Sequence, residues 1–177
     1  MAWLPFAALA LDLLLPDPKR LPHPVQAIGR LADFLEPRVR KLPNPVLAGG
    51  MALTAILLLT GWAAFMLTIL PLGAGLFFSL YLAWAGLALG SLVRHGEEAL
   101  HSILRAESTP DSLLIFQARR DVQKLVSRNT EGMNIDNLYR SLAESLSENF
   151  NDAFVAPFFW LCLGGPVGLW LYKAAST

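Results

Sequence analysis

Charged side chains are absent from residues 42–93, a run of 52 positions without Asp, Glu, Lys, Arg or His. A transmembrane helix needs about 20 apolar residues, so this run is long enough for two crossings. Over the whole chain, 54% of the 177 residues are hydrophobic and only 16% are charged, which is too apolar for a soluble domain of this length. The sequence therefore predicts an integral membrane protein.

Several other features are scarce, and each absence narrows the function. The single cysteine, Cys162, cannot form an internal disulfide, and it reads as a small buried hydrophobe or, alternatively, a catalytic thiol. Basic and acidic residues number 14 each, so no net positive field favours a nucleic-acid partner. The motifs GxxxxGK[ST], CxxC, HExxH and GxSxG are also missing, which argues against the nucleotide, metal and hydrolase sites that they mark.

The apolar segments predict an all-α, polytopic membrane protein that forms one membrane domain over residues 1–177. The segments lie at about residues 2–15, 46–70, 76–93 and 153–172. The turn Pro71–Gly75 separates the two central helices, and the first segment is short for a complete span. The last is interrupted at Pro157 and at Gly164-Gly165-Pro166, so we expect a broken or re-entrant helix there.

Basic residues other than Lys173 fall only in two polar segments, 16–41 and 94–152. The positive-inside rule assigns both segments to the cytoplasmic face of a multi-pass protein, so chemistry on soluble metabolites is expected on that side. Within 94–152, helical periodicity indicates amphipathic helices. Thr109-Pro110-Asp111 begins one of them, 129–137 reads as a loop, and a further helix covers about 136–151.

Three carboxylates recur every four residues near the end of the second polar segment: Glu144, Glu148 and Asp152. In a helix this spacing places them on one face, where like charges repel. Only Arg140 lies within a helical turn as a basic neighbour, so a hard cation such as Mg²⁺ is a natural ligand for the stripe. The alternative interpretation is an ordinary solvated helix face.

Two further groups of residues could carry chemistry. Asp12 is an acid inside an apolar run, which suggests a functional residue or, alternatively, a cap near the membrane interface. In the proline-rich segment that follows, His23 could bind phosphate, transfer a proton or serve structure alone. The arginines of 119–128, close to Ser127, Asn129 and Gly132, suit phosphate or carboxylate binding. Contact with anionic lipid is the competing explanation for those arginines.

Several of these runs resemble the adenosylcobinamide-phosphate synthase family of cobalamin biosynthesis (CbiB/CobD). The matching runs are Leu11–Pro24, Ile28-Gly29-Arg30, Ala143–Asn149, Asp152, Val155–Trp160, Gly164-Gly165-Pro166 and Tyr172-Lys173-Ala174, in the family's order. The chain departs from the family pattern at Pro16, Asn129 and Ala153, where Gly, Asp and Gly are usual. The family continues beyond the Tyr-Lys-Ala run, so the chain is expected to lack the family's C-terminal part.

The resemblance implies an ATP-dependent carbon–nitrogen ligase of the cell inner membrane that uses Mg²⁺. Its substrates would be the corrinoid adenosylcobyric acid and an aminoalcohol phosphate, joined by an amide bond. The implied roles are catalysis by Glu148 or His23; substrate or phosphate binding by Arg20, Arg30, Arg128, Asn149 and Lys173; and metal binding by Asp12, Asp17, Glu144, Glu148 and Asp152.

Two other functions fit the same residues. A truncated, non-catalytic relative could act as a membrane scaffold or sensor, and a small cation transporter could use Asp12 and the acidic stripe as its path. The lipid bilayer is a partner under every hypothesis, and nucleic acid is a partner under none. A homo-oligomer, or an assembly with other cobalamin-pathway proteins, is a further expectation.

Overall fold

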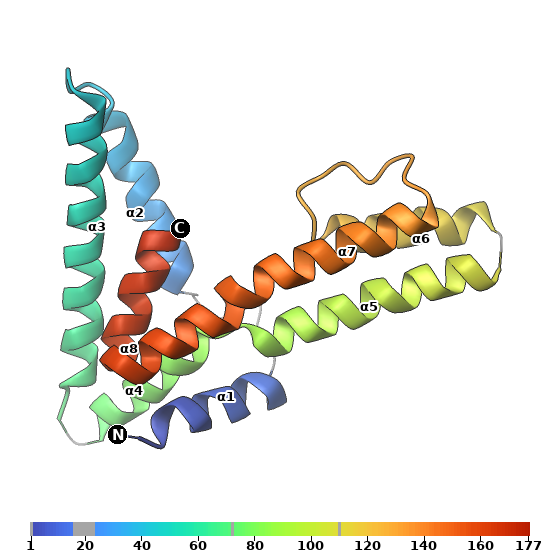
Figure 1. The fold of residues 1–177 in the computed structure, drawn as a ribbon. Coiled ribbons are helices and arrows are strands. Elements are labelled where there is room, and N and C mark those ends of the chain that lie inside the picture. The colour runs from blue at the N-terminus through green and yellow to red at the C-terminus, as the bar shows by residue number, and fades with distance from the viewer. Residues whose placement is uncertain (1, 16–23, 72, 110) are drawn as a thin grey trace. The chain divides into compact units, whose positions relative to one another are not determined.

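The computed structural model describes residues 2–15, 24–71, 73–109 and 111–177, and in these residues all regular structure is helical (Figure 1). The helices are α1 (Leu4–Leu14), α2 (Pro24–Val39), α3 (Pro45–Thr68), α4 (Ala74–Ala85), α5 (Leu89–Ser108), α6 (Ser112–Gln123), α7 (Ile135–Phe150), the π-helix η1 (Asn151–Val155) and α8 (Ala156–Ser176). The predicted all-α class is confirmed.

Three helical stretches of the described chain are long and apolar enough to cross a membrane: Pro45–Thr68, Ala74–Ser108 and Ile135–Ser176. The α3 stretch has only 11% of its apolar window buried inside the protein. Large side chains such as Leu58 and Trp62 are more than 60% exposed on it, as expected for a helix that lipid surrounds. The chain is a polytopic α-helical membrane protein.

Contacts divide the chain into two compact units, Met1–Ala88 with Val155–Thr177, and Leu89–Phe154. We call them the membrane unit and the helical unit. In the membrane unit, α3 packs against α2, α4 and α8, and α1 packs against α4. In the helical unit, α5 packs against both α6 and α7 (Figure 1). The single domain predicted for residues 1–177 stays a prediction.

The predicted helix 76–93 is wrong as one element, because α4 ends at Ala85 and α5 begins at Leu89. The break lies where the membrane unit is packed most closely. The side chain of Leu169 from α8 lies directly on Gly86, so close that a Cβ there would be 2.0 Å from the Leu169 Cδ2. Leu87 is fully buried. This packing by α8, which no local pattern reveals, accompanies the end of α4.

The interruption expected in the last apolar segment is confirmed at Gly165. Its backbone has φ 60° and ψ −157°, which breaks α8 into two helical parts. Beyond the break, Gly168 approaches the Trp160 carbonyl so closely that a Cβ on it would be 2.8 Å from that oxygen. The indole of Trp170 then donates a 3.0 Å hydrogen bond to the Leu82 carbonyl of α4. The second part of α8 is thereby fixed within the membrane unit.

A compact core holds the helical unit together. It consists of buried side chains from α5, α6 and α7: Ala99, Ile103, Ala106, Ala118, Val122, Leu138 and Leu142. The predicted start of α6 at Thr109-Pro110-Asp111 is confirmed, but its N-cap is Asp111, whose carboxylate accepts a hydrogen bond from the Leu113 amide, so the proline is not in the first turn. Asn134 caps α7 in the same way, through the Asn137 amide. These caps and the core fix the positions from which the polar face of α7 projects.

Candidate functional site

A small polar cleft lies between α7 and the loop that precedes it, within the helical unit. Its volume is about 30 Å³, and its lining consists of Val126, Ser127, Arg128, Ser141, Glu144, Ser145 and Glu148. A cavity needs about 10–15 Å³ to hold one water molecule, so this cleft has room for one or two atoms of that size. The cleft can therefore hold a small ion or a single phosphate oxygen, and it is far too small for a nucleotide.

An ion pair closes one side of this cleft. The Arg128 Nη1 lies 2.9 Å from the Glu144 Oε2, and the two side chains are 61% and 43% exposed. A pair this exposed contributes little to stability, typically less than about 1 kcal/mol. Its importance is chemical, because it places a guanidinium that can bind an anion beside carboxylates that can bind a cation.

The ion pair corrects the charge argument made from the sequence. Arg140 was the only basic residue expected near the acidic stripe, yet the partner of Glu144 is Arg128, from the loop before α7. Glu148 is exposed, and among the described residues no Lys or Arg forms an ion pair with its carboxylate. The stripe is thus partly compensated, and Glu148 is the carboxylate that remains available for a ligand.

The loop that carries Arg128 is fixed by two side chains. Gln123 donates from its Nε2 to the Val126 carbonyl at 3.1 Å and the Arg128 carbonyl at 2.9 Å. Thr130, which is 2% exposed, donates to the Arg119 carbonyl at 2.9 Å. A buried hydroxyl with satisfied hydrogen bonds makes a rigid anchor. Sequence reasoning missed both residues, because a polar residue in a loop gives no pattern that distinguishes an anchor from a solvated side chain.

Two residues expected to suit phosphate or substrate have structural partners instead. Arg119 donates from its Nε and Nη2 to the Met133 carbonyl, at 3.0 and 2.7 Å. Asn129 accepts a hydrogen bond from the Glu131 amide through its side chain, as in an Asx turn. Both side chains therefore shape the loop, and Arg128 remains the arginine that faces the cleft.

Asp152 does not continue the stripe in regular α geometry. It lies in the π-helix Asn151–Val155, where the wider turn changes the register of the side chains relative to α7. Its Oδ1 accepts a 3.0 Å hydrogen bond from Asn151. Among the described residues, no group of three or more His, Cys, Asp and Glu side chains is arranged to hold a metal ion.

The side chains that line the cleft offer oxygen ligands of the kind that Mg²⁺ prefers. Glu144 and Glu148 offer carboxylate oxygens, and Ser141 and Ser145 offer hydroxyls, all of which are the hard oxygen ligands that Mg²⁺ takes. Mg²⁺ sites that also contact phosphate often need only one or two carboxylates. The donor chemistry of the cleft therefore fits Mg²⁺, and the metal roles of these two glutamates stay a prediction.

The other predicted site residues are spread over the chain. Asp12 is 1% exposed in α1, and Arg30 is exposed on α2. Asn149 uses its Nδ2 to donate to the Ser145 hydroxyl at 3.1 Å, which fixes one wall of the cleft. Lys173 lies in the last turn of α8. The predicted roles of Asp17, Arg20 and His23 fall outside the described residues.

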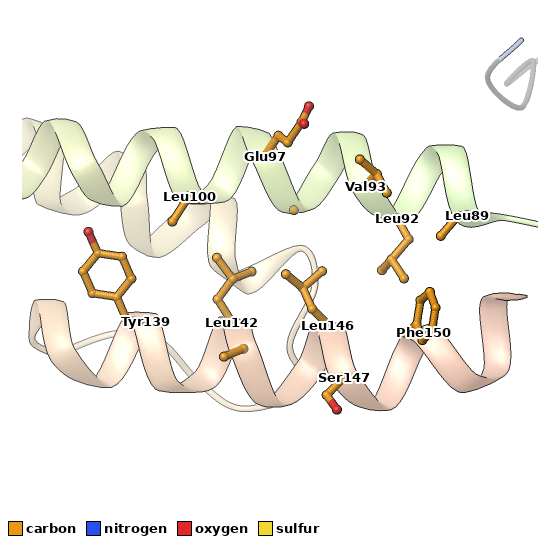
Figure 2. Close-up of a pocket in the computed structure, with 12 residues that line it drawn as sticks. Leu89, Leu92, Val93, Glu97, Leu100, Tyr139, Leu142, Leu146, Ser147 and Phe150 are labelled. Atoms are coloured by element: carbon orange, nitrogen blue, oxygen red, sulfur yellow. The ribbon is translucent and has the colours of Figure 1, made fainter. Parts of the chain in front are cut away.

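An apolar groove of about 590 Å³ lies between α5 and α7 in the helical unit (Figure 2). Leu92, Leu146 and Phe150 point into it, and Glu97 points away from it. Such a groove cannot solvate a phosphate, because its lining offers almost no polar atoms. The apolar residues that line it recur at helical spacing along α5, so the sequence reveals an amphipathic helix face. The sequence does not reveal that neighbouring helices leave part of this face uncovered.

Asp121 on α6 forms polar contacts that contribute to the stability of the helical unit. It accepts hydrogen bonds from Ser102 at 2.6 Å and Lys124 at 2.7 Å. Burial raises the pKa of Asp121, but these hydrogen bonds and the nearby charges of Lys124 and Arg120 outweigh that effect and lower it below 3.8. The ionised form is therefore favoured by folding.

Because the pKa of Asp121 is lowered on folding, its contribution is complete above its unfolded pKa and is lost as the pH falls through its folded pKa. Asp121→Asn should lower the free energy of unfolding by about 1 kcal/mol near neutral pH. The difference from the wild type should shrink below about pH 4. Thermal unfolding in detergent, followed by circular dichroism, measures this. The exposed Glu98→Gln is the control, and a difference independent of pH would contradict the ion-pair explanation.

Comparison with known proteins places the chain in a family. The family model described as CobD/Cbib protein matches residues 5–177. Cobalamin biosynthesis protein CobD of Pelobacter propionicus is 38% identical over 96% of this chain and 52% of its own length. Probable cobalamin biosynthesis protein CobD of Thermococcus kodakarensis is 37% identical, over 99% of this chain and 57% of its own. No solved structure matches.

The extent of the match matters for its meaning. The match covers nearly all of the chain, whereas the chain spans about half the length of the curated relatives it matches. Identity near 38% over 175 residues includes both the membrane unit and the helical unit. The helical architecture and the matched residues lead to one conclusion: this chain belongs to the CobD/CbiB family.

Proposed function

We propose that the chain acts in cobalamin biosynthesis as part of an adenosylcobinamide-phosphate synthase. In this reaction an amide bond joins adenosylcobyric acid to an aminoalcohol phosphate, with ATP as co-substrate and Mg²⁺ as cofactor. The observation that carries the proposal is the family match over residues 5–177, with relatives named for cobalamin biosynthesis. The cleft at Arg128, Glu144 and Glu148 supports it, because these are groups suited to phosphate and to Mg²⁺.

The chemistry requires an activated carboxyl group. A carboxylate oxygen of the corrinoid attacks the γ-phosphorus of ATP, and ADP leaves, which gives an acyl phosphate. The amine nitrogen then attacks the acyl carbon, and inorganic phosphate leaves as the amide bond forms. The amine loses a proton in this second step, and a positioned base that accepts it accelerates the step by about 10²–10⁴-fold.

The residues of the cleft have distinct roles in this proposal. Arg128 binds a phosphate oxygen. The ion pair between its Nη1 and the Glu144 Oε2, at 2.9 Å, orients the guanidinium. Glu144 and Glu148 would hold Mg²⁺, which neutralises phosphate charge when it is bound. Glu148 is the described candidate for the base. A residue cannot serve as metal ligand and free base at once, so the two roles of Glu148 belong to different steps or are alternatives.

The place of the reaction follows from the same residues. The polar groups of the cleft lie in the helical unit, which carries seven of the 14 Lys and Arg residues of the chain. An excess of Lys and Arg marks the cytoplasmic side of a membrane protein. We therefore propose an inner-membrane location with the active side in the cytoplasm, where ATP and the phosphorylated substrate are present.

The test is an assay of amide formation by membranes that contain the folded protein. Adenosylcobyric acid, ATP and aminopropanol phosphate are supplied with and without Mg²⁺, and the product and ADP are measured. One ADP per amide is expected, with no product after chelation of Mg²⁺. Absence of product from folded protein with Mg²⁺ present would contradict the proposal. Substrate binding without turnover, measured in parallel, would favour a non-catalytic member of the family.

A further inference from the structure

The exposed side of α2 carries basic residues immediately before a membrane-spanning helix. α2 buries Ile28 and packs against α3, whereas Phe34, Arg38 and Lys41 are exposed. Phe34 and Arg38 are four residues apart and lie on one side of α2, whereas Lys41 follows the end of α2 in the turn before α3. These three exposed residues, Phe34, Arg38 and Lys41, are called the basic edge of α2 below.

Two charges of the basic edge lack an acidic partner. Arg40, which lies nearby, forms an ion pair with Glu36 and is neutralised. The Arg38 guanidinium instead lies 3.4 Å from the centre of the Phe34 ring and donates to the Phe34 carbonyl. Lys41 has no hydrogen-bond or ion-pair partner among the described residues. Arg38 and Lys41 therefore present two uncompensated positive charges, one of them held in place by an aromatic ring.

The position of α3 places these charges near the lipid headgroups. α3 has 24 residues, so it is about 36 Å long, slightly longer than the roughly 30 Å hydrocarbon core. Its first residue, Pro45, then lies close to the boundary between hydrocarbon and headgroups. The basic edge precedes Pro45 by only a short turn, capped by the Asn44 side chain. From the length of α3 we therefore expect Lys41 and Arg38 at the depth of the lipid phosphates, and Phe34 is an aromatic side chain suited to that interface.

We propose that the basic edge of α2 binds the headgroup of an anionic phospholipid. Arg38 donates hydrogen bonds to the phosphate, Lys41 supplies a second charge, and the exposed Phe34 ring lies at the level of the upper acyl chain. A zwitterionic phospholipid also carries a phosphate, but its choline cation offsets the attraction to Arg38 and Lys41. The site is separate from the cleft of the helical unit, so it does not depend on the proposed enzymatic activity.

The proposal is tested by titrating the purified chain in detergent micelles with short-chain phosphatidylglycerol or phosphatidylcholine. Bound lipid is measured by native mass spectrometry, and stability is measured by thermal shift. Phosphatidylglycerol should bind more tightly and raise the unfolding temperature more than phosphatidylcholine does. Arg38→Gln and Lys41→Gln should each weaken phosphatidylglycerol binding about fivefold, and the two together about thirtyfold. Higher salt should weaken it further.

Arg105→Gln with Arg140→Gln is the matched control, because it removes two exposed positive charges from the helical unit. Equal loss of binding in the control would overturn the proposal, as would unchanged binding in the Arg38 and Lys41 double variant. Inorganic phosphate is added in a separate arm, and stabilisation equal to that by phosphatidylglycerol would identify a soluble-anion site instead. Circular dichroism checks folding, and the single variants provide the test if the double variant does not fold.

Discussion

Glu148→Gln is expected to reduce amide formation at least about a hundredfold, while the protein remains folded. The carboxylate is exposed on α7 and lines the cleft beside Arg128 and Glu144. Glutamine keeps the size of the side chain but removes the negative charge that a metal ligand or a proton acceptor requires. Either proposed role predicts a loss in the range of 10²–10⁴-fold. The rate of product formation in membranes measures it.

The two roles of Glu148 differ in how the variant responds to Mg²⁺. If Glu148 is a ligand, raising the Mg²⁺ concentration should restore part of the rate, and the apparent affinity for Mg²⁺ should fall. If it is the base, Mg²⁺ should make no difference and the pH dependence of the rate should change. Glu131→Gln removes an equal charge from an exposed loop position of the same unit and should leave the rate unchanged. Wild-type activity in Glu148→Gln would remove this residue from the site.

Gly165→Ala is expected to lower the free energy of unfolding by about 1–3 kcal/mol. Gly165 has φ 60° and ψ −157°, a backbone region that is essentially restricted to glycine. Apart from the adjoining residues and the nearby backbone of its own helix, no described atom lies within 4 Å of the position that a Cβ would occupy. The expected cost therefore comes from the backbone alone. Thermal unfolding in detergent micelles, at matched protein concentration, gives the difference.

The preceding residue supplies a matched control for this prediction. A Cβ on Gly164 would also meet nothing within 4 Å, but Gly164 does not have a positive φ. Gly164→Ala should therefore be neutral or should stabilise the protein by up to about 1 kcal/mol, because alanine favours a helix. Equal destabilisation by both substitutions would show that the backbone angle of Gly165 is not the cause.

Local sequence patterns identified most of the helices for clear physical reasons. The uncharged run 42–93 requires lipid or protein around it, and the structure has α3 and α4 there. Asp111 lies before an apolar helical repeat, and its side chain caps α6. Pro166 lacks an amide donor and disfavours α-helical backbone in the residue before it, and α8 breaks at that residue, Gly165. Each of these features depends on neighbours in sequence, so the sequence reveals it.

Sequence patterns predicted only part of the candidate site. The stripe of carboxylates on α7 follows from the spacing of Glu144 and Glu148, and both do line one cleft. The partner of Glu144 could not be found from spacing. Arg128 reaches it because Gln123 and Thr130 hold the loop in one conformation, and those hydrogen bonds exist only after the chain has folded.

By itself, the sequence determined the helical class, the membrane character, the start of α6 near Asp111 and the break in α8, because solvation and backbone preferences act over a few residues. The tertiary structure decided where α4 ends, which arginine faces Glu144 and which carboxylate remains available. These depend on the contact between Leu169 and Gly86 and on the anchored loop before α7. Residues far apart in sequence make both arrangements, and packing alone determines which of them meet.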